Sequence, residues 1–526
     1  MINEIFQQTE QLKSRLNESQ VNIIDQLLTR LSEVIGQKSL EELTSAKNVN
    51  TLKKIKSVIK IIYRILNTQQ VEYDQVKEFL PELPYSKDYW DWEIGEELII
   101  SHQEGNITST KEVNMSKTLG IEFSRDMKHY VFEYFIGYNA MADRNRSIVV
   151  DSQAWSTIFN SVNSKYISAN GHDVYVTGKD SNDIEVIYHN DQKIEGQPVY
   201  HAFYLKLFQS NEDNTVIAIE ARIGHEKTIM QNGKLWENKH DGLQGCSVSK
   251  HGQTVATSVN DFDSYGSTVI VNDKVWDSRF NGVGTPVVSD NGQTTAVFVI
   301  KNNKEQTICF NDQVWDKSFE RLLKTPYLSY DGKVIVAVAW TKEEPTSKYH
   351  IVVNQDMWQT ELDRVGDIVI SPDNQQVAVD GYYINTPKGS QITVTKHFLV
   401  INDQIQKKAY ADISEMQYSP DSQKLVYVGK NNRKADLMVN DQKLNGGFDD
   451  ILKVTISSDS KYVAAAIKTN KDYQLIINKK VLNDVYEGIF KIEFSPDNKK
   501  IMILATRPDR QFYRIVKDIS KIKPLD

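Results

Sequence analysis

The sequence predicts a mainly-β protein, a β-propeller of four-stranded blades preceded by an α-helical domain. Two repeated marks carry this prediction. One is a serine-containing polar turn between apolar strands. The other is an Asn-Asp type turn followed by a short segment that contains Trp or an aliphatic residue. A third observation, helical spacing of apolar residues before residue 80, separates the N-terminal domain from the repeats.

The serine turn is clearest in residues 370–379, Ile-Ser-Pro-Asp-Asn-Gln-Gln-Val-Ala-Val. Pro372 fixes φ at the first corner, and Asp373 and Asn374 tolerate a tight backbone. Residues 377–379 then suit a buried pleated strand. About ten such turns occur, roughly 38 to 48 residues apart, which is typical of propeller blades. They begin at Ser124, Ser168, Ser210, Ser249, Ser289, Ser329, Ser371, Ser419, Ser457 and Ser495.

The second mark lies between successive serine turns. It reads Val-Ile-Val-Asn-Asp-Lys-Val-Trp in residues 269–276 and Ile-Cys-Phe-Asn-Asp-Gln-Val-Trp in residues 308–315. Asn-Asp favours positive φ and therefore closes a hairpin. Two hairpins per repeat give the four strands of one blade. We interpret the recurring tryptophans as packing between blades, with an exposed stacking platform as the alternative; they are Trp155, Trp236, Trp276, Trp315 and Trp358.

This pattern resembles the WD40-like propeller repeats of the TolB (PD40) type, whose signature is Ser-Pro-Asp-Gly before an apolar strand. The turns at Ser371, Ser419 and Ser495 carry Ser-Pro-Asp, and other turns carry the glycine without the proline. The resemblance covers about residues 118–518. It implies the propeller fold and leaves the activity open, because this fold hosts many unrelated functions.

The Asn-Asp-Lys-Val-Trp sequence of residues 272–276 suggests a narrower resemblance, as does Trp-Asp-Trp at residues 90–92. Both are similar to the tryptophan-rich, WD40-like subunit of transmembrane redox complexes in sulfate-reducing bacteria. That resemblance implies a subunit of a membrane-associated electron-transfer complex that carries no redox centre of its own. The chain departs from it where Ile405, Leu444 and Leu482 replace the tryptophan.

Residues 1–80 are expected to form an α-helical bundle or hairpin that ends near Pro81 and Pro84. In residues 52–66 the apolar side chains fall on one arc of a helix and a basic arc lies opposite. This basic arc is either the solvated face of a core helix or a docking face for an acidic partner or an anionic membrane. Its residues are Lys53, Lys56, Lys60 and Arg64.

Residues 81–117 form an aromatic-rich connector, and residues 118–526 form the propeller. A closed propeller usually completes its last blade with a strand from the other terminus, which removes exposed sheet edges. Residues 106–113 or 120–123 are the expected closing strand. About ten repeats fit either one large ring or two smaller propellers.

Composition limits the classes of function. The formal net charge of -8 argues against general nucleic-acid binding. Two cysteines, Cys246 and Cys309, are too few for an iron–sulfur cluster or a structural zinc site, and buried thiols are expected instead of a disulfide. Without a signal-like start or an apolar run of about 18 residues, we expect a cytoplasmic protein, peripheral at most to the inner membrane.

Motifs for chemistry are missing from the sequence: there is no Gly-x-Ser-x-Gly, Walker loop, His-Glu-x-x-His or Cys-x-x-Cys. The repeated aspartates at positions 373, 421, 459 and 497 are expected to form turns and not to bind calcium. We therefore expect a non-enzymatic scaffold with protein partners and no cofactor or metal. The alternative is an enzyme or small-ligand sensor that uses the central channel of the propeller.

Overall fold

The structure is a computed structural model, and the chain divides into two units, residues 1–91 and 92–526. No α-helix occurs in the part that the structure describes, and the helices expected in residues 1–80 lie outside it. The described residues are 87, 90–100, 118–135, 145–168, 171, 173–194, 207–210, 216–223, 226–231, 234–250, 252–261, 266–301, 305–341, 348–385, 394–509 and 511–525.

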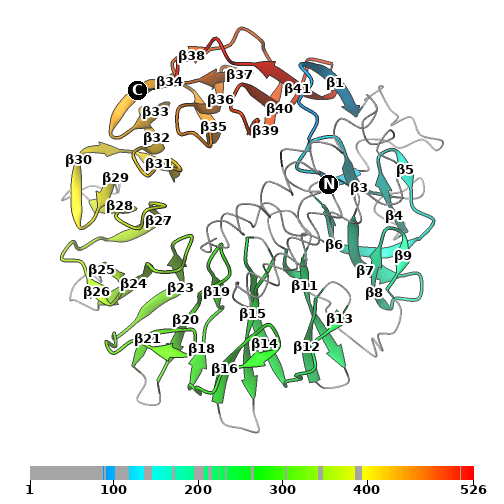
Figure 1. The fold of residues 1–526 in the computed structure, drawn as a ribbon, viewed down its shortest axis with the longest axis vertical. Helices are drawn as coiled ribbons and strands as arrows, with labels where there is room; N and C mark the ends of the chain where they lie inside the picture. Colours follow the sequence, from blue (N-terminus) through cyan, green and yellow to red (C-terminus); the bar gives the residue numbers. More distant parts are fainter. Residues whose placement is uncertain are drawn as a thin grey trace, which may run out of the picture. The chain divides into compact units, whose positions relative to one another are not determined.

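The described strands form antiparallel sheets that follow one another along the chain (Figure 1). Nine sheets result, but the eight-stranded one consists of two four-stranded sheets joined by the single pair Arg146–Phe159. Counting these two separately gives ten blades, numbered here in chain order. Each repeat of the sequence, which contains one serine turn and one Asn-Asp type turn, therefore forms one blade, as predicted.

The strands of the first five blades have the following bounds. Blade 1 holds β2 (Thr118–Phe123), β3 (Tyr130–Phe135), β4 (Arg146–Val150) and β5 (Gln153–Ala154), and blade 2 holds β6 (Phe159–Ile167), β7 (Val174–Asp180), β8 (Glu185–His189) and β9 (Gln192–Lys193). Blade 3 holds β10 (Leu207–Ser210), β11 (Ile217–Ile223), β12 (Glu226–Gln231) and β13 (Lys234–Leu235), and blade 4 holds β14 (Gly242–Val248), β15 (Val255–Asp261), β16 (Gly266–Val271) and β17 (Lys274–Val275). Blade 5 holds β18 (Gly282–Val283), β19 (Val287–Val288), β20 (Thr295–Ile300), β21 (Gln306–Phe310) and β22 (Gln313–Val314).

The last five blades complete the series. Blade 6 holds β23 (Leu322–Leu328), β24 (Ile335–Thr341), β25 (Lys348–Val353) and β26 (Asp356–Met357), and blade 7 holds β27 (Arg364–Ile370), β28 (Val377–Asn385), β29 (Val394–Ile401) and β30 (Gln404–Tyr410). Blade 8 holds β31 (Asp412–Tyr418), β32 (Leu425–Asn431), β33 (Lys434–Val439) and β34 (Gln442–Phe448), and blade 9 holds β35 (Asp450–Ile456), β36 (Val463–Thr469), β37 (Asp472–Ile477) and β38 (Lys480–Val481). Blade 10 holds β39 (Gly488–Phe494), β40 (Lys500–Thr506), β41 (Phe512–Asp518) and β1 (Gly95–Ile100).

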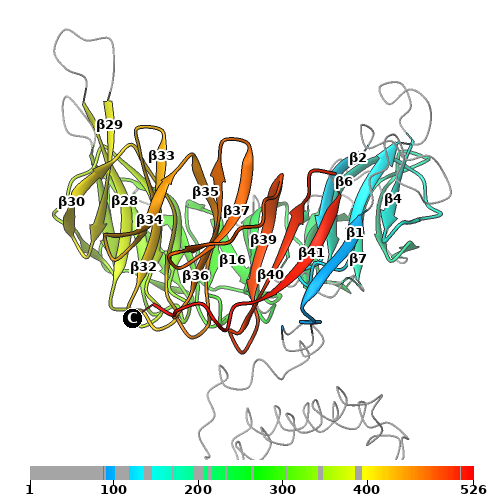
Figure 2. The same ribbon diagram turned by 90° about the horizontal axis from the view of Figure 1, so that it is seen from above.

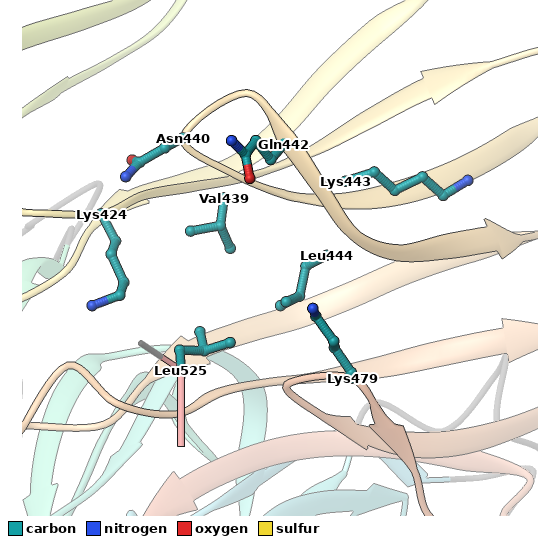
Figure 3. Close-up of a pocket in the computed structure, with 8 residues that line it drawn as sticks. All are labelled: Lys424, Val439, Asn440, Gln442, Lys443, Leu444, Lys479 and Leu525. Carbon is teal, nitrogen blue, oxygen red and sulfur yellow. The ribbon is translucent and has the colours of Figure 1, made fainter. Parts of the chain in front are cut away.

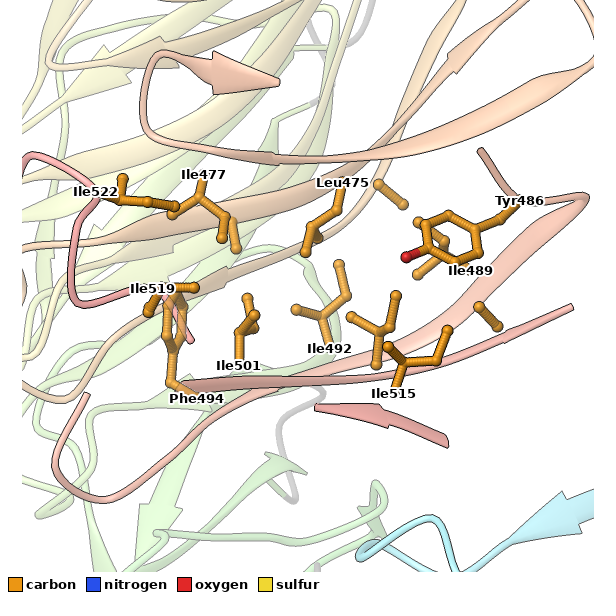
Figure 4. Close-up of a cluster of buried hydrophobic side chains, with 14 residues drawn as sticks. Leu475, Ile477, Tyr486, Ile489, Ile492, Phe494, Ile501, Ile515, Ile519 and Ile522 are labelled. Atoms are coloured by element: carbon orange, nitrogen blue, oxygen red, sulfur yellow. The ribbon is translucent and has the colours of Figure 1, made fainter. Parts of the chain in front are cut away.

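Each blade is buried on both faces, because alternate residues of a strand point to opposite sides of its sheet. In blade 8, Val426 and Val428 pack toward blade 9, whereas Leu425 and Tyr427 pack toward blade 7. A cluster of buried apolar side chains joins every consecutive pair of blades in the described chain. Figure 4 shows the cluster between blades 9 and 10, where Tyr486 and Leu475 meet Ile492 and Ile515.

Blade 10 also packs on blade 1, so the ten blades form one closed series and not two. Ile100 of blade 10 joins Tyr130, Phe132 and Val149 of blade 1 in a further buried cluster. The aromatic rings of Phe512 and Phe123 lie 5.2 Å apart across the same boundary.

The closing strand is β1, which pairs antiparallel with β41 along the outer side of blade 10 (Figure 2). The sequence had favoured two other segments. Residues 120–123 belong to β2, the first strand of blade 1, so that expectation was wrong. Residues 106–113 lie outside the described residues. Residues 97–101 are a possible strand from the sequence, and β1 confirms a strand there, although its closing role was assigned to the other segments.

The serine turns depend on a left-handed fourth residue. Asn374 has φ of 64° and Gly332 has φ of 71°, a region that Asn and Gly adopt at low cost. At Gly332 a Cβ would also lie 2.3 Å from the side chain of Thr294. Other turns place Asn498, Ser422, Ser460 or Met127 in this left-handed position, so Gly is required only where a neighbouring side chain comes this close.

Candidate binding grooves on blades 8 to 10

The aspartates of the serine turns are bound within their own turns. Ser371 donates its hydroxyl to Asp373 Oδ1 at 2.6 Å and accepts the N–H of Gln376 at 2.9 Å. The N–H of Gln375 also reaches Asp373 Oδ1, at 3.0 Å. The hydrogen bond from Ser371, followed by that from Gln375, lowers the pKa of the Asp373 carboxyl. The same contacts recur at Asp421, Asp459 and Asp497.

These carboxylates are therefore turn-forming groups. Within the described ranges, no three His, Cys, Asp or Glu side chains gather closely enough to hold a metal ion.

A groove of about 270 Å³ lies between the outer strands of blades 8 and 9 (Figure 3). Its floor is apolar and is formed by Val439 at the end of β33, Leu444 on β34, and Leu525 near the end of the chain. These three half-buried side chains pack against the cluster between blades 8 and 9. We call this feature the lysine groove, because three lysines surround the floor.

Those lysines come from three different segments. Lys424 precedes β32, Lys443 is on β34, and Lys479 lies in the hairpin between β37 and β38. Lys443 pairs with Asp436 at 2.7 Å, whereas Lys424 and Lys479 form no ion pair among the described residues. The lining contains no acidic side chain in the described part of the chain, so the groove is positively charged.

The C-terminal segment is held firmly at this groove. Leu525 donates its N–H to the carbonyl of Lys461 at 2.8 Å, and Asn478 donates its side-chain amide to the carbonyl of Lys523 at 2.9 Å. On the opposite side, Asn440 accepts the N–H of Leu425 at 2.8 Å. The floor is therefore built by fixed backbone, which favours a preformed site.

The sequence analysis missed this groove. Its lysines are separated by long stretches of chain, and each resembles an ordinary exposed lysine of a repeat. Lys424 and Lys479 line one groove only because blades 8 and 9 pack against each other. The one sequence signal was local: Leu444 replaces the tryptophan that other blades carry after the hairpin.

A second groove, of about 580 Å³, lies between blades 9 and 10. It is lined by the end of β38, by β1 and by β41, and its charged side chains are Glu96, Lys480, Asp484, Arg507, Lys517 and Asp518. We call it the seam groove. Of the residues named from the sequence, Leu482 lines it, and the groove itself exists only where β1 closes blade 10.

Blade 7 contains a buried acid–histidine pair. His397 Nδ1 on β29 lies 2.9 Å from Asp380 Oδ1 on β28, and the ring of Tyr382 stacks on His397 at 4.4 Å. The side chains of Asp380 and His397 are 5% and 14% exposed. Burial raises the pKa of Asp380 to about 6, although His397 opposes the shift. Because the pair is enclosed, it joins strands and does not form an open site.

The tryptophans predicted from the sequence all follow the short fourth strands. Trp236, Trp276 and Trp315 are buried, and they belong to the clusters of blades 3–4, 4–5 and 5–6. Trp155 and Trp358 are partly buried against the clusters of blades 1–2 and 6–7. The basic residues Lys53, Lys56, Lys60 and Arg64 lie outside the described residues.

The cysteines are free and buried, which confirms the prediction of thiols. Burial raises the pKa of Cys246 and of Cys309 to about 12, so neither is a reactive thiolate at neutral pH.

Within the described ranges there is no helix long and apolar enough to cross a membrane.

No protein-family model and no curated protein sequence matches this chain. Among solved structures, a eukaryotic initiation factor is similar at 12% identity with a TM-score of 0.38, over 69% of this chain and 94% of that one. The β-propeller domain of the Trilobed protease from Pyrococcus furiosus is similar at 12% identity and a TM-score of 0.28, over 52% and 96%. The acylaminoacyl peptidase of Pyrococcus horikoshii is similar at 13% identity and a TM-score of 0.28, over 50% and 48%.

Structural alignments with such low identities and TM-scores carry no argument about function. The assignment of a propeller-type repeat fold rests on the sheet topology and on the interfaces between blades.

Proposed function

We propose that this protein is a non-enzymatic interaction scaffold whose lysine groove binds an extended segment of a partner protein that carries acidic and apolar side chains. The supporting observation is the combination of Lys424, Lys443 and Lys479 around an apolar floor, without an acidic side chain among the described lining residues. This is unusual for a chain with a net charge of -8. Charge complementarity selects an acidic partner.

The location of the groove favours a peptide segment over a small ligand. A volume of about 270 Å³ is below the usual range for small-molecule pockets, which begins at about 300 Å³. The groove adjoins β34, the outer strand of blade 8, so it is continuous with a sheet edge. An extended segment lying along that edge would place one apolar side chain on Leu444 and acidic neighbours on the lysines.

The finer assignment rests on the sequence resemblances. The Ser-Pro-Asp turns support membership of the TolB-type repeat family. The Asn-Asp-Lys-Val-Trp element supports a subunit or accessory of a membrane-associated electron-transfer complex. In that setting the protein is cytoplasmic and peripheral to the inner membrane. The basic arc of Lys53, Lys56, Lys60 and Arg64 supplies a further docking face, which co-sedimentation with anionic vesicles tests.

Peptide binding to the full chain tests the lysine groove. The probe is a fluorescein-labelled eight-residue peptide of alternating Glu and Leu, followed by anisotropy at two salt concentrations. The double variant Lys424→Gln, Lys479→Gln should bind it about tenfold more weakly, since each exposed ion pair contributes at most about 1 kcal/mol. Binding to the unaltered protein should weaken as salt is raised.

The matched control is Lys434→Gln, which removes an exposed lysine on the same blade that pairs with Asp449. It should leave the affinity unchanged. Equal affinity of the double variant and the unaltered protein would refute the site. Binding of inorganic phosphate without any binding of the peptide would favour a small-ligand sensor instead.

A further inference from the structure

Six described blades share one geometry at their outer edge. After the two-residue fourth strand, the chain leaves the sheet at a Trp or Leu and returns to the third strand a few residues later. In blade 5 the chain leaves at Trp315 and returns at Phe319, which bridges to Gln306. The equivalent return pairs are Arg146–Phe159, Lys227–His240, Ser267–Phe280, Tyr349–Leu362 and Tyr473–Tyr486.

We call the residues between the point of departure and the point of return the excursion. In five of these six blades, a side chain from the hairpin of the next blade accepts backbone N–H groups of the excursion, and we call this contact the cap. Asp312 of blade 5 accepts the N–H of Asp277 at 2.8 Å and that of Ser278 at 3.2 Å, both from blade 4. Asp191, Asp273 and Asp403 make the same pair of bonds to blades 1, 3 and 6, and Gln355 makes one bond to blade 5. An acceptor from the next hairpin is therefore a regular part of the repeat.

Blade 9 has the same excursion but no cap. Its chain leaves at Leu482, and the N–H of Asn483 takes the place that the N–H of Asp277 has in blade 4. Among the described residues, no acceptor binds the N–H of Asn483. The N–H of Asp484 is covered by its own carboxylate, whose pKa is lowered first by Lys517 and also by that N–H.

The cap is missing because blade 10 has no outer hairpin. Strand pairing identifies the position: Phe310 pairs with Ala296, and Val516 pairs with Met502 at the same point of the repeat. Asp518 thus corresponds to Asp312. It accepts the N–H of Ser520 at 2.7 Å instead, because the chain continues toward its C-terminal segment. The fourth strand comes from β1, and the seam groove occupies the space of the absent hairpin.

The seam groove offers both charge and apolar surface. Arg507 binds Glu96 at 2.6 Å and 3.2 Å, and Lys517 pairs with Asp484 at 2.9 Å. Lys480, which also lines the groove, forms no ion pair among the described residues. Ile94 is 54% exposed in the lining. Ile515 lines the groove and also belongs to the buried cluster of blades 9 and 10, which Figure 4 shows, so the groove adjoins a packed core.

We propose that the seam groove binds an aspartate-bearing β-turn of a partner protein, which replaces the missing hairpin. Its carboxylate accepts the N–H of Asn483 and lies near Lys480, and its flanking apolar side chain covers Ile94. A second copy of this chain is disfavoured as the occupant. The described Asn-Asp hairpins already use their aspartates internally: Asp273, Asp312 and Asp403 cap the preceding blade, and Asp441 binds two tyrosines.

The test uses the full chain and a labelled peptide with the sequence of residues 269–276, Val-Ile-Val-Asn-Asp-Lys-Val-Trp. Fluorescence anisotropy should show saturable binding, about tenfold weaker for the peptide with Ala in place of Asp. Gly95 lines the groove, and a Cβ added at this position would meet no other atom within 4 Å. Gly95→Trp should therefore fill the groove and abolish binding, whereas Gly95→Ala should preserve it.

Two neighbouring lysines distinguish the grooves. Lys480 lines the seam groove and Lys479 lines the lysine groove. Lys480→Glu should weaken the turn peptide at least about fivefold and leave the Glu-Leu peptide unaffected, and Lys479→Glu should do the opposite. The proposal is overturned if the turn peptide does not bind, if its Ala version binds equally, or if Gly95→Trp binds as well as Gly95→Ala. None of these outcomes affects the lysine groove.

Discussion

Blades 5 and 8 contain the same hairpin but use it differently. In both, Asn-Asp adopts positive φ at the two central residues: 43° and 64° at Asn311 and Asp312, and 47° and 60° at Asn440 and Asp441. In both, the asparagine accepts the N–H at the start of the second strand, at 2.9 Å and 2.8 Å. The conformation of the turn and the hydrogen bond of its asparagine are thus the same in both blades, although the neighbouring blades differ.

The aspartate differs because the preceding blade differs. Asp312 caps the backbone that follows Trp276 in blade 4. Blade 7 has Ile405 in that place, 45% exposed, and its outer strand β30 runs on to Tyr410. Asp441 accepts the hydroxyl of Tyr427 at 2.8 Å and that of Tyr410 at 3.3 Å. One residue of the repeat therefore joins blades through backbone N–H groups in one region and through tyrosines in another.

The largest expected effect comes from the tryptophan that distinguishes the two regions. Trp315 is 3% exposed, and its ring meets that of Phe319 edge-on at 6.5 Å. Trp315→Ala should lower the free energy of unfolding by roughly 3–5 kcal/mol, because it removes buried apolar area and leaves a cavity. Urea unfolding followed by circular dichroism measures the loss.

Trp358 gives a matched control, since it is only partly buried at the same point of blade 6. Trp358→Ala should lower the free energy of unfolding by less than Trp315→Ala does. An unchanged urea midpoint for Trp315→Ala would mean that the tryptophan does not stabilise the packing between blades 5 and 6.

A smaller effect separates the two uses of aspartate. Asp441→Ala leaves the hydroxyls of Tyr410 and Tyr427, both almost fully buried, without their carboxylate and should cost roughly 1–3 kcal/mol. Asp312→Ala uncovers backbone N–H groups at an exposed residue, where water replaces the cap, and should cost roughly 0.5–2 kcal/mol. Adding Tyr427→Phe should recover part of the loss in Asp441→Ala.

Among the described residues, no tyrosine hydroxyl donates to Asp312, so the comparison of double and single variants distinguishes the aspartate that binds backbone N–H groups from the one that binds tyrosines. If Tyr427→Phe makes Asp441→Ala still less stable, the tyrosines do not depend on this carboxylate.

The sequence predicts the repeat well because its information is local. Ser371, Asp373 and Asn374 form their turn from contacts within six residues, and a hairpin needs only Asn-Asp between apolar strands. The joints between blades are non-local. Whether Asp441 meets a backbone N–H or a tyrosine is decided by residues about 14 to 31 positions earlier.

The grooves were not predictable for the same reason. Lys424 and Lys479 line the same groove only through the packing of blades 8 and 9. The seam groove depends on which segment closes blade 10. The sequence named residues 106–113 or 120–123, and neither alternative would have placed Glu96 beside Arg507.

The joint between blades 10 and 1 is of a third kind, because its described residues include neither the aspartate cap nor the tyrosine pair. Lys491 of β39 donates to the carbonyls of Phe123 and Ser124 at 2.7 Å and 3.1 Å. Arg514, which is 3% exposed, donates to the carbonyl of Asp126 at 3.0 Å. Two cations thus bind the first serine turn of the chain.

The buried cation predicts a pH dependence that the other joints lack. Burial lowers the pKa of Lys491 to about 8 from its ordinary value of 10.5, despite the opposing effect of Glu493. Between these values the unfolded chain holds the proton on this lysine and the folded chain releases it. Because the unfolded state then binds more protons, stability from this group should rise with pH, by at most about 1.4 kcal/mol per pH unit.

The measurement is the difference in free energy of unfolding between the unaltered protein and Lys491→Met at several pH values from 7 to 10. Below pH 8 the buried Lys491 is charged, so it contributes least to the free energy of unfolding. Above pH 8 the free energy of unfolding of the unaltered protein should rise relative to that of Lys491→Met. Taking the difference cancels the titration of buried tyrosines, which acts in the opposite direction. A difference that stays constant from pH 7 to 10 would mean that Lys491 is solvated like an ordinary lysine, and the joint of blades 10 and 1 would then be held by its aromatic cluster alone.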